Sequence, residues 1–249
     1  MLAFSFTAYR LPTVLGFILS VVLLVATQTS AQTPTDSPEK DLWPTLSATF
    51  EFSSRFHLQT TAENHHSIDS HFDQWELGAI FTYQRWRRIW RHDADVDEED
   101  RHHIVLGGGY EFVRANDNGS IKREHRIVFQ STPKYSVGLG ILVQDRNRLE
   151  FRWKEEGYNF RYRNKLIIDR PFQIGSVTFI PYAAGELFWD RNSHAWNENR
   201  YAFGVRLPYK KRLMLDTFYL RKNCTGCNRT PTDVLGLTLN LYIKLKKTR

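Results

Sequence analysis

Arginine and glutamate recur at every second position of the stretch Arg148-Leu149-Glu150-Phe151-Arg152-Trp153, with large apolar residues between them. After the polar turn Lys154-Glu155-Glu156-Gly157 the alternation resumes. One face then carries Asn159, Arg161, Arg163 and Lys165, and the other carries Phe160, Tyr162, Asn164 and Leu166. A period of two residues is typical of a β-strand with two different faces. The stretch therefore predicts a β-hairpin whose charged face can form ion pairs and whose other face is apolar.

The hairpin leaves open which face meets water. A soluble β-sandwich would bury the apolar face in its core and expose the charged face. A membrane β-barrel would turn the apolar face to lipid and the charged face to its interior.

Other residue types that could do chemistry give weaker signals. Cys224 and Cys227, the only cysteines, are spaced for a small disulfide in a loop of an exported protein. The histidine-rich segment with His65, His66, Asp69 and His71 lacks dependable metal-ligand spacing. The sequence therefore predicts no metal site, no cofactor and no assigned catalytic group.

Composition excludes two classes of protein. Aromatic residues make up 14% and charged residues 24% of the 249 residues, and the mean hydropathy is -0.47. These values exclude a helical membrane protein and a disordered chain. The net charge of +7 could suggest nucleic acid as a partner. We expect none, because the arginines recur at strand periodicity and the chain is predicted to be exported.

The N-terminus has the features of a secretory signal. Arg10 precedes an apolar run that ends at Ala26, and small residues suited to cleavage follow up to Ala31. We predict a signal peptide at residues 1–31, a flexible lead-in at 32–41 and a β-barrel domain at 42–249. An uncleaved membrane anchor is the alternative, but the apolar core is shorter than the roughly 20 residues that a spanning helix needs.

Alternating runs continue along the chain and predict about ten antiparallel strands. The first runs from Leu46 to Leu58 and the last from Asp233 to Lys246. Most of the longer polar connections are predicted at one end of the strands: Gln59 to Ser70, Ala115 to Ser120, Lys154 to Gly157, Asp190 to Glu198 and Asn223 to Thr232. The acidic link Arg87 to Arg101 is the exception, since it falls on the side of the tight turns.

Three features favour the membrane barrel: long strands, an even strand count and aromatic residues near strand ends. These aromatics are Trp75, Tyr83, Trp86, Trp90, Trp153, Phe188, Trp189, Tyr201, Tyr209, Tyr219 and Tyr242. The fold class is therefore predicted as all-β, an antiparallel up-and-down transmembrane barrel. The charged faces would form an interior network of Arg146, Arg148, Glu150, Arg152, Arg161, Arg163, Glu186, Arg200 and Arg206. Side chains nearly fill an eight-stranded barrel, so we expect a narrow or closed interior at about ten strands.

Several motifs resemble those of the bacterial family called domain of unknown function 2490. They are Arg148-Leu149-Glu150-Phe151-Arg152, Arg161-Tyr162-Arg163, Pro181-Tyr182, Glu186-Leu187-Phe188, and Asn199-Arg200 with Gly204. The similarity spans roughly Leu42 to Leu245 and is concentrated in the second half. The resemblance implies a bacterial outer-membrane β-barrel with no assigned activity. The C-terminal sequence YIKLKKTR departs from the terminal aromatic residue that such barrels commonly present to their assembly machinery.

The expected partners are outer-membrane lipid and the barrel assembly machinery, and the sequence does not indicate an oligomeric state. Two other functions remain open. A hydrolase could use His57, His65, His66, Asp69, His71, Asp190 and His194 near one predicted rim. An adhesin could use the loop Asp190 to Arg200.

Overall fold

The computed structural model describes residues 37–86, 103–210, 212–224 and 230–245. Twelve strands are present in these ranges: β1 (Glu39–Glu51), β2 (Phe56–Ser67), β3 (Phe72–Trp86), β4 (His103–Asp117), β5 (Ser120–Ser136), β6 (Leu142–Lys154), β7 (Gly157–Asp169), β8 (Phe172–Ile174), β9 (Val177–Asp190), β10 (Ala195–Tyr209), β11 (Leu213–Cys224) and β12 (Thr232–Lys244). Within the same ranges, no helix is long and apolar enough to cross a membrane.

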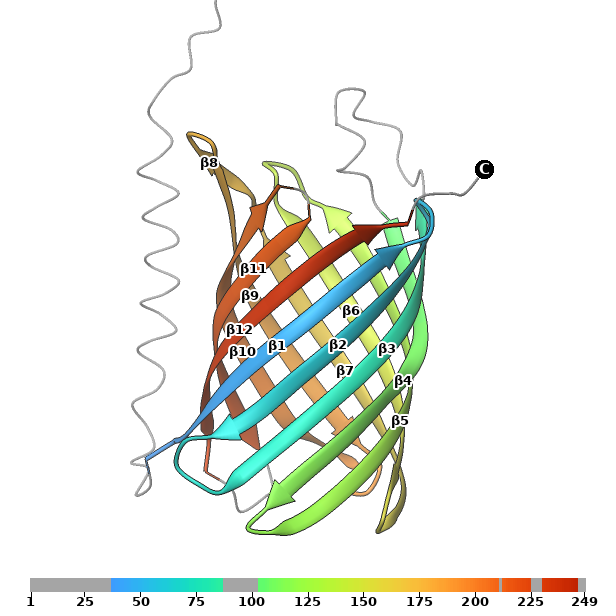
Figure 1. The fold of residues 1–249 in the computed structure, drawn as a ribbon, viewed down its shortest axis with the longest axis vertical. Coiled ribbons are helices and arrows are strands. Elements are labelled where there is room, and N and C mark those ends of the chain that lie inside the picture. Colours follow the sequence, from blue (N-terminus) through green and yellow to red (C-terminus); the bar gives the residue numbers. More distant parts are fainter. Residues whose placement is uncertain (1–36, 87–102, 211, 225–229, 246–249) are drawn as a thin grey trace, which may run out of the picture. The chain divides into compact units, whose positions relative to one another are not determined.

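Eleven of the strands close into a barrel (Figure 1). Each strand pairs with its neighbours in the chain, β7 pairs with β9, and β12 returns to β1. The short strand β8 pairs only with the first residues of β9, in a separate hairpin at one rim. The expectation of an all-β barrel is confirmed, whereas the expected strand number was one too low.

The additional strand was missed because a turn preserves the alternation of the sequence. Residues 52–55 form a turn in which the Ser53 hydroxyl accepts hydrogen bonds from the backbone N–H groups of Arg55 and Phe56. A four-residue turn keeps even positions on the outer face of both strands, so Phe50 and Leu58 remain partners on that face. The single strand predicted from Leu46 to Leu58 is therefore the end of β1, a turn and the start of β2.

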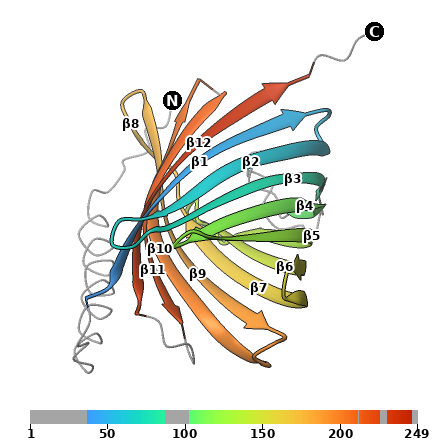
Figure 2. The same ribbon diagram turned by 60° about the horizontal axis from the view of Figure 1, so that its bottom comes forward.

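The barrel closes through a parallel pair, which corrects the expectation of a purely antiparallel barrel. Strands β1 and β12 run in the same direction along their whole length, from the pair Glu39 and Thr232 to the pair Glu51 and Lys244 (Figure 1). Consecutive strands joined by turns alternate in direction, so the first and last of an odd number must be parallel. Figure 2 shows β1 between β2 and β12 from the other viewpoint.

The connections predicted to share one end do share one rim, but the extra strand places that rim on the side where β1 begins and not on the opposite side. We call the rim where β1 begins the N-terminal rim, formed by the connections 68–71, 118–119, 155–156 and 191–194. The opposite C-terminal rim carries residues 52–55, 137–141 and 170–176, and β10 ends and β11 begins there. The acidic link Arg87 to Arg101 lies outside the described residues, but β3 ends and β4 begins at the C-terminal rim.

Local sequence explains one of the shortest connections. Asn118 and Gly119 join β4 to β5, and both have positive φ angles, of 51° and 86°. Asn-Gly is the preferred pair for a two-residue hairpin turn whose twist matches the flanking strands. β1 begins at Glu39, inside the segment predicted as a lead-in.

The exposed fractions of β6 side chains define the two faces of the barrel wall. Arg148, Glu150 and Arg152 are 6%, 0% and 4% exposed, whereas the intervening Leu149 and the following Trp153 are 37% and 42% exposed. The charged face therefore points into the barrel and the apolar face points outward. Strand alternation alone produces this arrangement once the sheet closes.

The interior also contains an apolar cluster on the wall formed by β1 and β9 to β12. Its buried members are Trp43, Ala184, Ala202, Leu220 and Val234. Phe188, which the sequence suggested as a rim aromatic, is fully buried. It faces inward because, like Glu186 and Asp190, it occupies an even-numbered position on β9, and these positions share one face of the strand.

Candidate functional site: a charged barrel interior

The inward faces of β3 to β6 are joined by arginines that bridge carboxylates from different strands. Arg126 on β5 binds Glu76 on β3 at 2.9 Å and Glu124 on its own strand at 2.5 Å. Glu124 also accepts hydrogen bonds from Arg152 on β6, one of them at 2.8 Å. Charge-assisted, multidentate bonds of this kind are the strongest in proteins. They connect three strands, β3, β5 and β6, through their side chains.

A second group of ion pairs joins β4, β6, β7 and β9. Arg148 pairs with Glu111 and lies 3.1 Å from Glu150. Arg163 contacts Glu150 at 2.8 Å and Glu186 at 2.9 Å. Glu150 and Glu186 are therefore shared carboxylates, and leaving either charge unpaired in this buried environment would be costly.

The remaining interior arginines of the predicted network also have acidic neighbours. Arg146 binds Glu186 at 3.1 Å, and Arg161 lies 3.5 Å from Asp190. Arg200 binds Glu198 at 2.6 Å. Closer to the C-terminal rim, Arg206 contacts Asp169 at 3.1 Å and Asp216 at 3.5 Å. The structure thus places all nine residues of that network on the inner surface.

The Phe188 ring lies at the centre of three guanidinium groups. The guanidinium carbons of Arg200, Arg163 and Arg161 are 4.4, 4.7 and 5.7 Å from its centroid. Cations over an aromatic face are attracted by the ring quadrupole. The ring therefore stabilises three cations that repel one another.

His65 carries the only imidazole among the described residues that line the cavity inside the barrel. Its Nε2 contacts a Glu63 carboxylate oxygen, and its Nδ1 lies 3.4 Å from the Gln74 amide nitrogen. The ring stacks on Trp43 at 4.0 Å between centroids. Both ring nitrogens are thus engaged in a structural contact, and the arrangement does not resemble a nucleophile with its general base.

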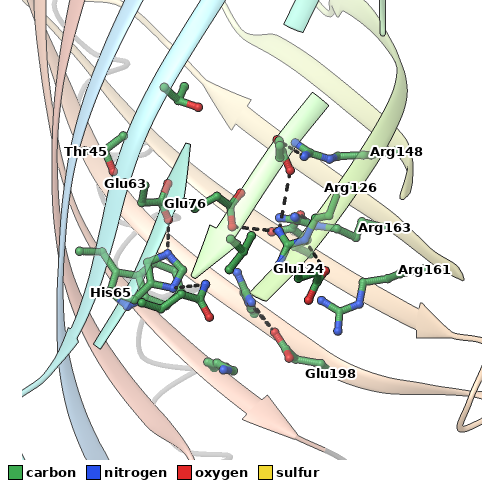
Figure 3. Close-up of a pocket in the computed structure, with 18 of the residues that line it drawn as sticks. Thr45, Glu63, His65, Glu76, Glu124, Arg126, Arg148, Arg161, Arg163 and Glu198 are labelled. Carbon is green, nitrogen blue, oxygen red and sulfur yellow. Dashed lines mark hydrogen bonds and ion pairs between the residues drawn. The ribbon is translucent and has the colours of Figure 1, made fainter. Parts of the chain in front are cut away.

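These side chains surround a cavity of about 780 Å³ inside the barrel. In Figure 3, Glu63 and His65 lie on one side of it, and Arg148, Arg163 and Arg161 lie on the other. The volume is in the range of small-molecule sites, although such sites are mostly apolar. The arrangement can bind charged groups from several directions.

The residues proposed for hydrolysis do not form one site. His57 is the second residue of β2, at the C-terminal rim, whereas His65 and His66 lie near the other end of that strand. Asp69, His71, Asp190 and His194 lie at or beside the N-terminal rim. The prediction that all of them share one rim was wrong for His57 alone, because the region read as a loop is β2, which runs from one rim to the other.

The predicted adhesive loop, the predicted disulfide and the possible metal ligands can each be compared with the structure. Most of the proposed adhesive loop is strand, because β10 begins at Ala195. Cys224 at the end of β11 is disulfide-bonded, whereas Cys227 lies outside the described residues. Among the described residues, no group of three His, Cys, Asp or Glu side chains could hold a metal ion.

The sequence did not identify several interior residues. Trp43, Phe188 and Phe218 face inward although aromatics were expected on the outer face. These aromatics occupy the same alternate positions as the charged residues of their strands. That pattern was the signal that could have identified them as inward-facing. Glycine opposite an aromatic was a second signal, since Gly236 faces Phe218 and Gly204 faces Tyr182.

The fold and its interior define a class, a closed β-barrel with apolar residues outside and a buried ionic network inside. A family model matches residues 40–229, and the chain belongs to that family, described as protein of unknown function DUF2490. Neither the curated proteins nor the solved structures that were compared with the chain contain a match.

Proposed function

We propose that this chain is a bacterial outer-membrane β-barrel whose interior is held closed, or very narrow, by its ionic network. The exposure pattern of β6 is the observation that carries this proposal. Large apolar side chains point outward and charged ones are buried inside, the reverse of what a water-soluble barrel requires. Export through a cleaved signal peptide, insertion by the barrel assembly machinery and contact with outer-membrane lipid are parts of the same proposal.

Strand length and aromatic placement support the proposal. The barrel strands contain 12 to 17 residues, more than the roughly 9–11 that a tilted strand needs to cross a bilayer. Outward aromatics lie towards both ends of the wall, with Trp75, Trp153 and Trp196 near the N-terminal rim and Tyr135 and Tyr209 near the other. Such residues suit the two membrane interfaces.

The connections favour one orientation. Those of the N-terminal rim between β2 and β10 are short, with two residues at 118–119 and at 155–156. Periplasmic turns are short in outer-membrane barrels, and extracellular loops are longer. We therefore assign the N-terminal rim to the periplasm and the C-terminal rim, which carries the β8 hairpin, to the cell exterior.

Membrane fractionation combined with heat modifiability tests the location. The expected result is recovery of the protein in the outer-membrane fraction, and faster migration of the unheated form on a detergent gel. Recovery as a soluble periplasmic protein without a mobility shift would contradict the proposal.

Conductance in planar bilayers tests the closed interior. The side chains of Arg126, Arg148 and Arg163 meet carboxylates from other strands within the barrel, so we expect little or no current. A large and stable open channel would contradict a closed interior while leaving the location intact.

A further inference from the structure

A row of inward-facing residues crosses five neighbouring strands at one level of the sheet. Arg146 pairs with Lys165, and Lys165 pairs with Glu186. Glu186 pairs in turn with Arg200, and Arg200 pairs with Lys222. We call Arg146, Lys165, Arg200 and Lys222, together with the intervening Glu186, the basic row.

The basic row contains more positive than negative charge. Its single carboxylate, Glu186, is already bound by Arg146 at 3.1 Å and by Arg163 from the same wall at 2.9 Å. Arg200 is paired with Glu198 at 2.6 Å. Glu186 is therefore shared among several cations, and no ion pair within 4.0 Å joins it to Lys165, which lies beside it in the ladder.

Two donors of the row have no acceptor of their own. The buried Nε of Arg146 has no hydrogen-bond partner among the described residues. The Lys165 ammonium forms no ion pair with a carboxylate in the part of the chain that the structure describes. Buried donors are normally satisfied by protein, water or a ligand, and a cation is the costliest group to leave without a counter-charge.

All five residues of the row line the cavity of about 780 Å³. The cavity wall opposite them carries carboxylates, among them Glu63, Glu76 and Glu111. Those carboxylates already contact Arg126, Arg148 or His65, so an anion inside the barrel is attracted to the excess positive charge of the basic row. The excess positive charge of the row therefore determines where such a ligand binds.

We propose that the basic row is a binding site for a small polyanion that carries carboxylate or phosphate groups. The anion accepts hydrogen bonds from Lys165 and from the Nε of Arg146, and Arg200 follows on the far side of Glu186 in the row. The site does not depend on the proposed membrane location, because it is formed entirely within the barrel.

Isothermal titration calorimetry on the folded full-length protein in detergent tests the proposal. Citrate and inorganic phosphate are the probes, at constant ionic strength set with chloride. We expect saturable binding of at least one of them. Binding of citrate alone would indicate a carboxylate ligand, and binding of phosphate alone would indicate a phosphate ligand. Binding of both would indicate a site that recognises negative charge and does not distinguish the two groups.

Lys165→Gln is the decisive variant, and we expect at least tenfold weaker binding, which corresponds to about 1.4 kcal/mol. Because Lys165 has no carboxylate partner to lose, this variant should fold and resist urea at least as well as the parent without anion. Arg146→Gln is a second variant with the same expected loss of affinity. Lys134→Gln is the control, because Lys134 lies on β5 and does not line the cavity.

Three results would overturn the proposal. One is the absence of citrate and phosphate binding at constant ionic strength. Another is unchanged affinity in the folded Lys165→Gln protein. The last is an equal loss in Lys134→Gln, which would indicate a general charge effect. Each can be distinguished from a failure of the membrane proposal, which is measured by fractionation.

Discussion

The guanidinium of Arg200 lies over the ring of Phe188, with 4.4 Å between its central carbon and the ring centroid. Arg163 approaches the same ring at 4.7 Å. Because Phe188 is fully buried, its ring is not exposed to solvent, and cation–π attraction is stronger at desolvated sites. An aromatic side chain is therefore part of the ionic interior and holds like charges close together.

Replacing Phe188 should destabilise the barrel more than replacing an outward phenylalanine. Phe188→Leu keeps apolar volume but removes the ring, and we expect a loss of about 1–3 kcal/mol in the free energy of unfolding. Urea titration of the folded form on detergent gels measures it. Phe203→Leu, on the exposed face of β10, is the control, and equal losses would contradict the role of the ring.

Removing the shared carboxylate of Glu150 should have a larger effect. Glu150→Gln leaves Arg148 and Arg163 with fewer counter-charges in a buried site. Breaking a buried ion pair from one side costs about 3–5 kcal/mol. The exposed pair of Glu156 and Lys122, 3.9 Å apart, provides the control. Glu156→Gln should cost less than about 1 kcal/mol, and similar values for both variants would refute a stabilising network.

Gly236 should tolerate no side chain while Phe218 is present. A Cβ at Gly236 would lie 2.0 Å from Cζ of Phe218, so we expect Gly236→Ala to cost about 1–3 kcal/mol or more through overpacking. Adding Phe218→Leu should recover part of the loss. The matched control is Gly185→Ala, whose Cβ would meet only Tyr201, at 4.0 Å. Equal stability of the two alanine variants would contradict the packing.

A charge on the outer wall tests lipid contact. Leu237 lies near the middle of β12 and is exposed. Leu237→Arg should weaken membrane folding by about 2–4 kcal/mol if that face meets hydrocarbon. Leu139→Arg, in the exposed connection between β5 and β6, should be close to neutral. Folding yields into lipid vesicles measure both, and an unaffected Leu237→Arg protein would argue against lipid at this position.

Paired cysteines test the parallel closure. Leu46 on β1 faces Leu239 on β12, a spacing that suits a disulfide between directly opposed residues. The double variant Leu46→Cys with Leu239→Cys should cross-link on oxidation, as seen by gel mobility before and after reduction. Leu46→Cys with Leu235→Cys, four residues out of register, should not. Preferential cross-linking of the second pair would disprove the register.

The sequence predicted the orientation of side chains well where alternation is uninterrupted. Arg148, Glu150 and Arg152 face inward and Trp153 faces outward, as the period of two residues indicated. It failed at residues 52–55, because a turn of even length leaves the alternation unchanged. That one error altered the strand number, the rim of each connection and the supposed grouping of His57 with His65.

By itself, the sequence determined that the chain forms β-strands with one charged and one apolar face, since this property follows from the local geometry of an extended backbone. Only the tertiary structure decided which strands meet, that β1 and β12 close in parallel, and which arginine pairs with which glutamate. Those features depend on register between strands far apart in the chain, and no local pattern encodes the register. The excess charge of the basic row likewise arises only when five strands align.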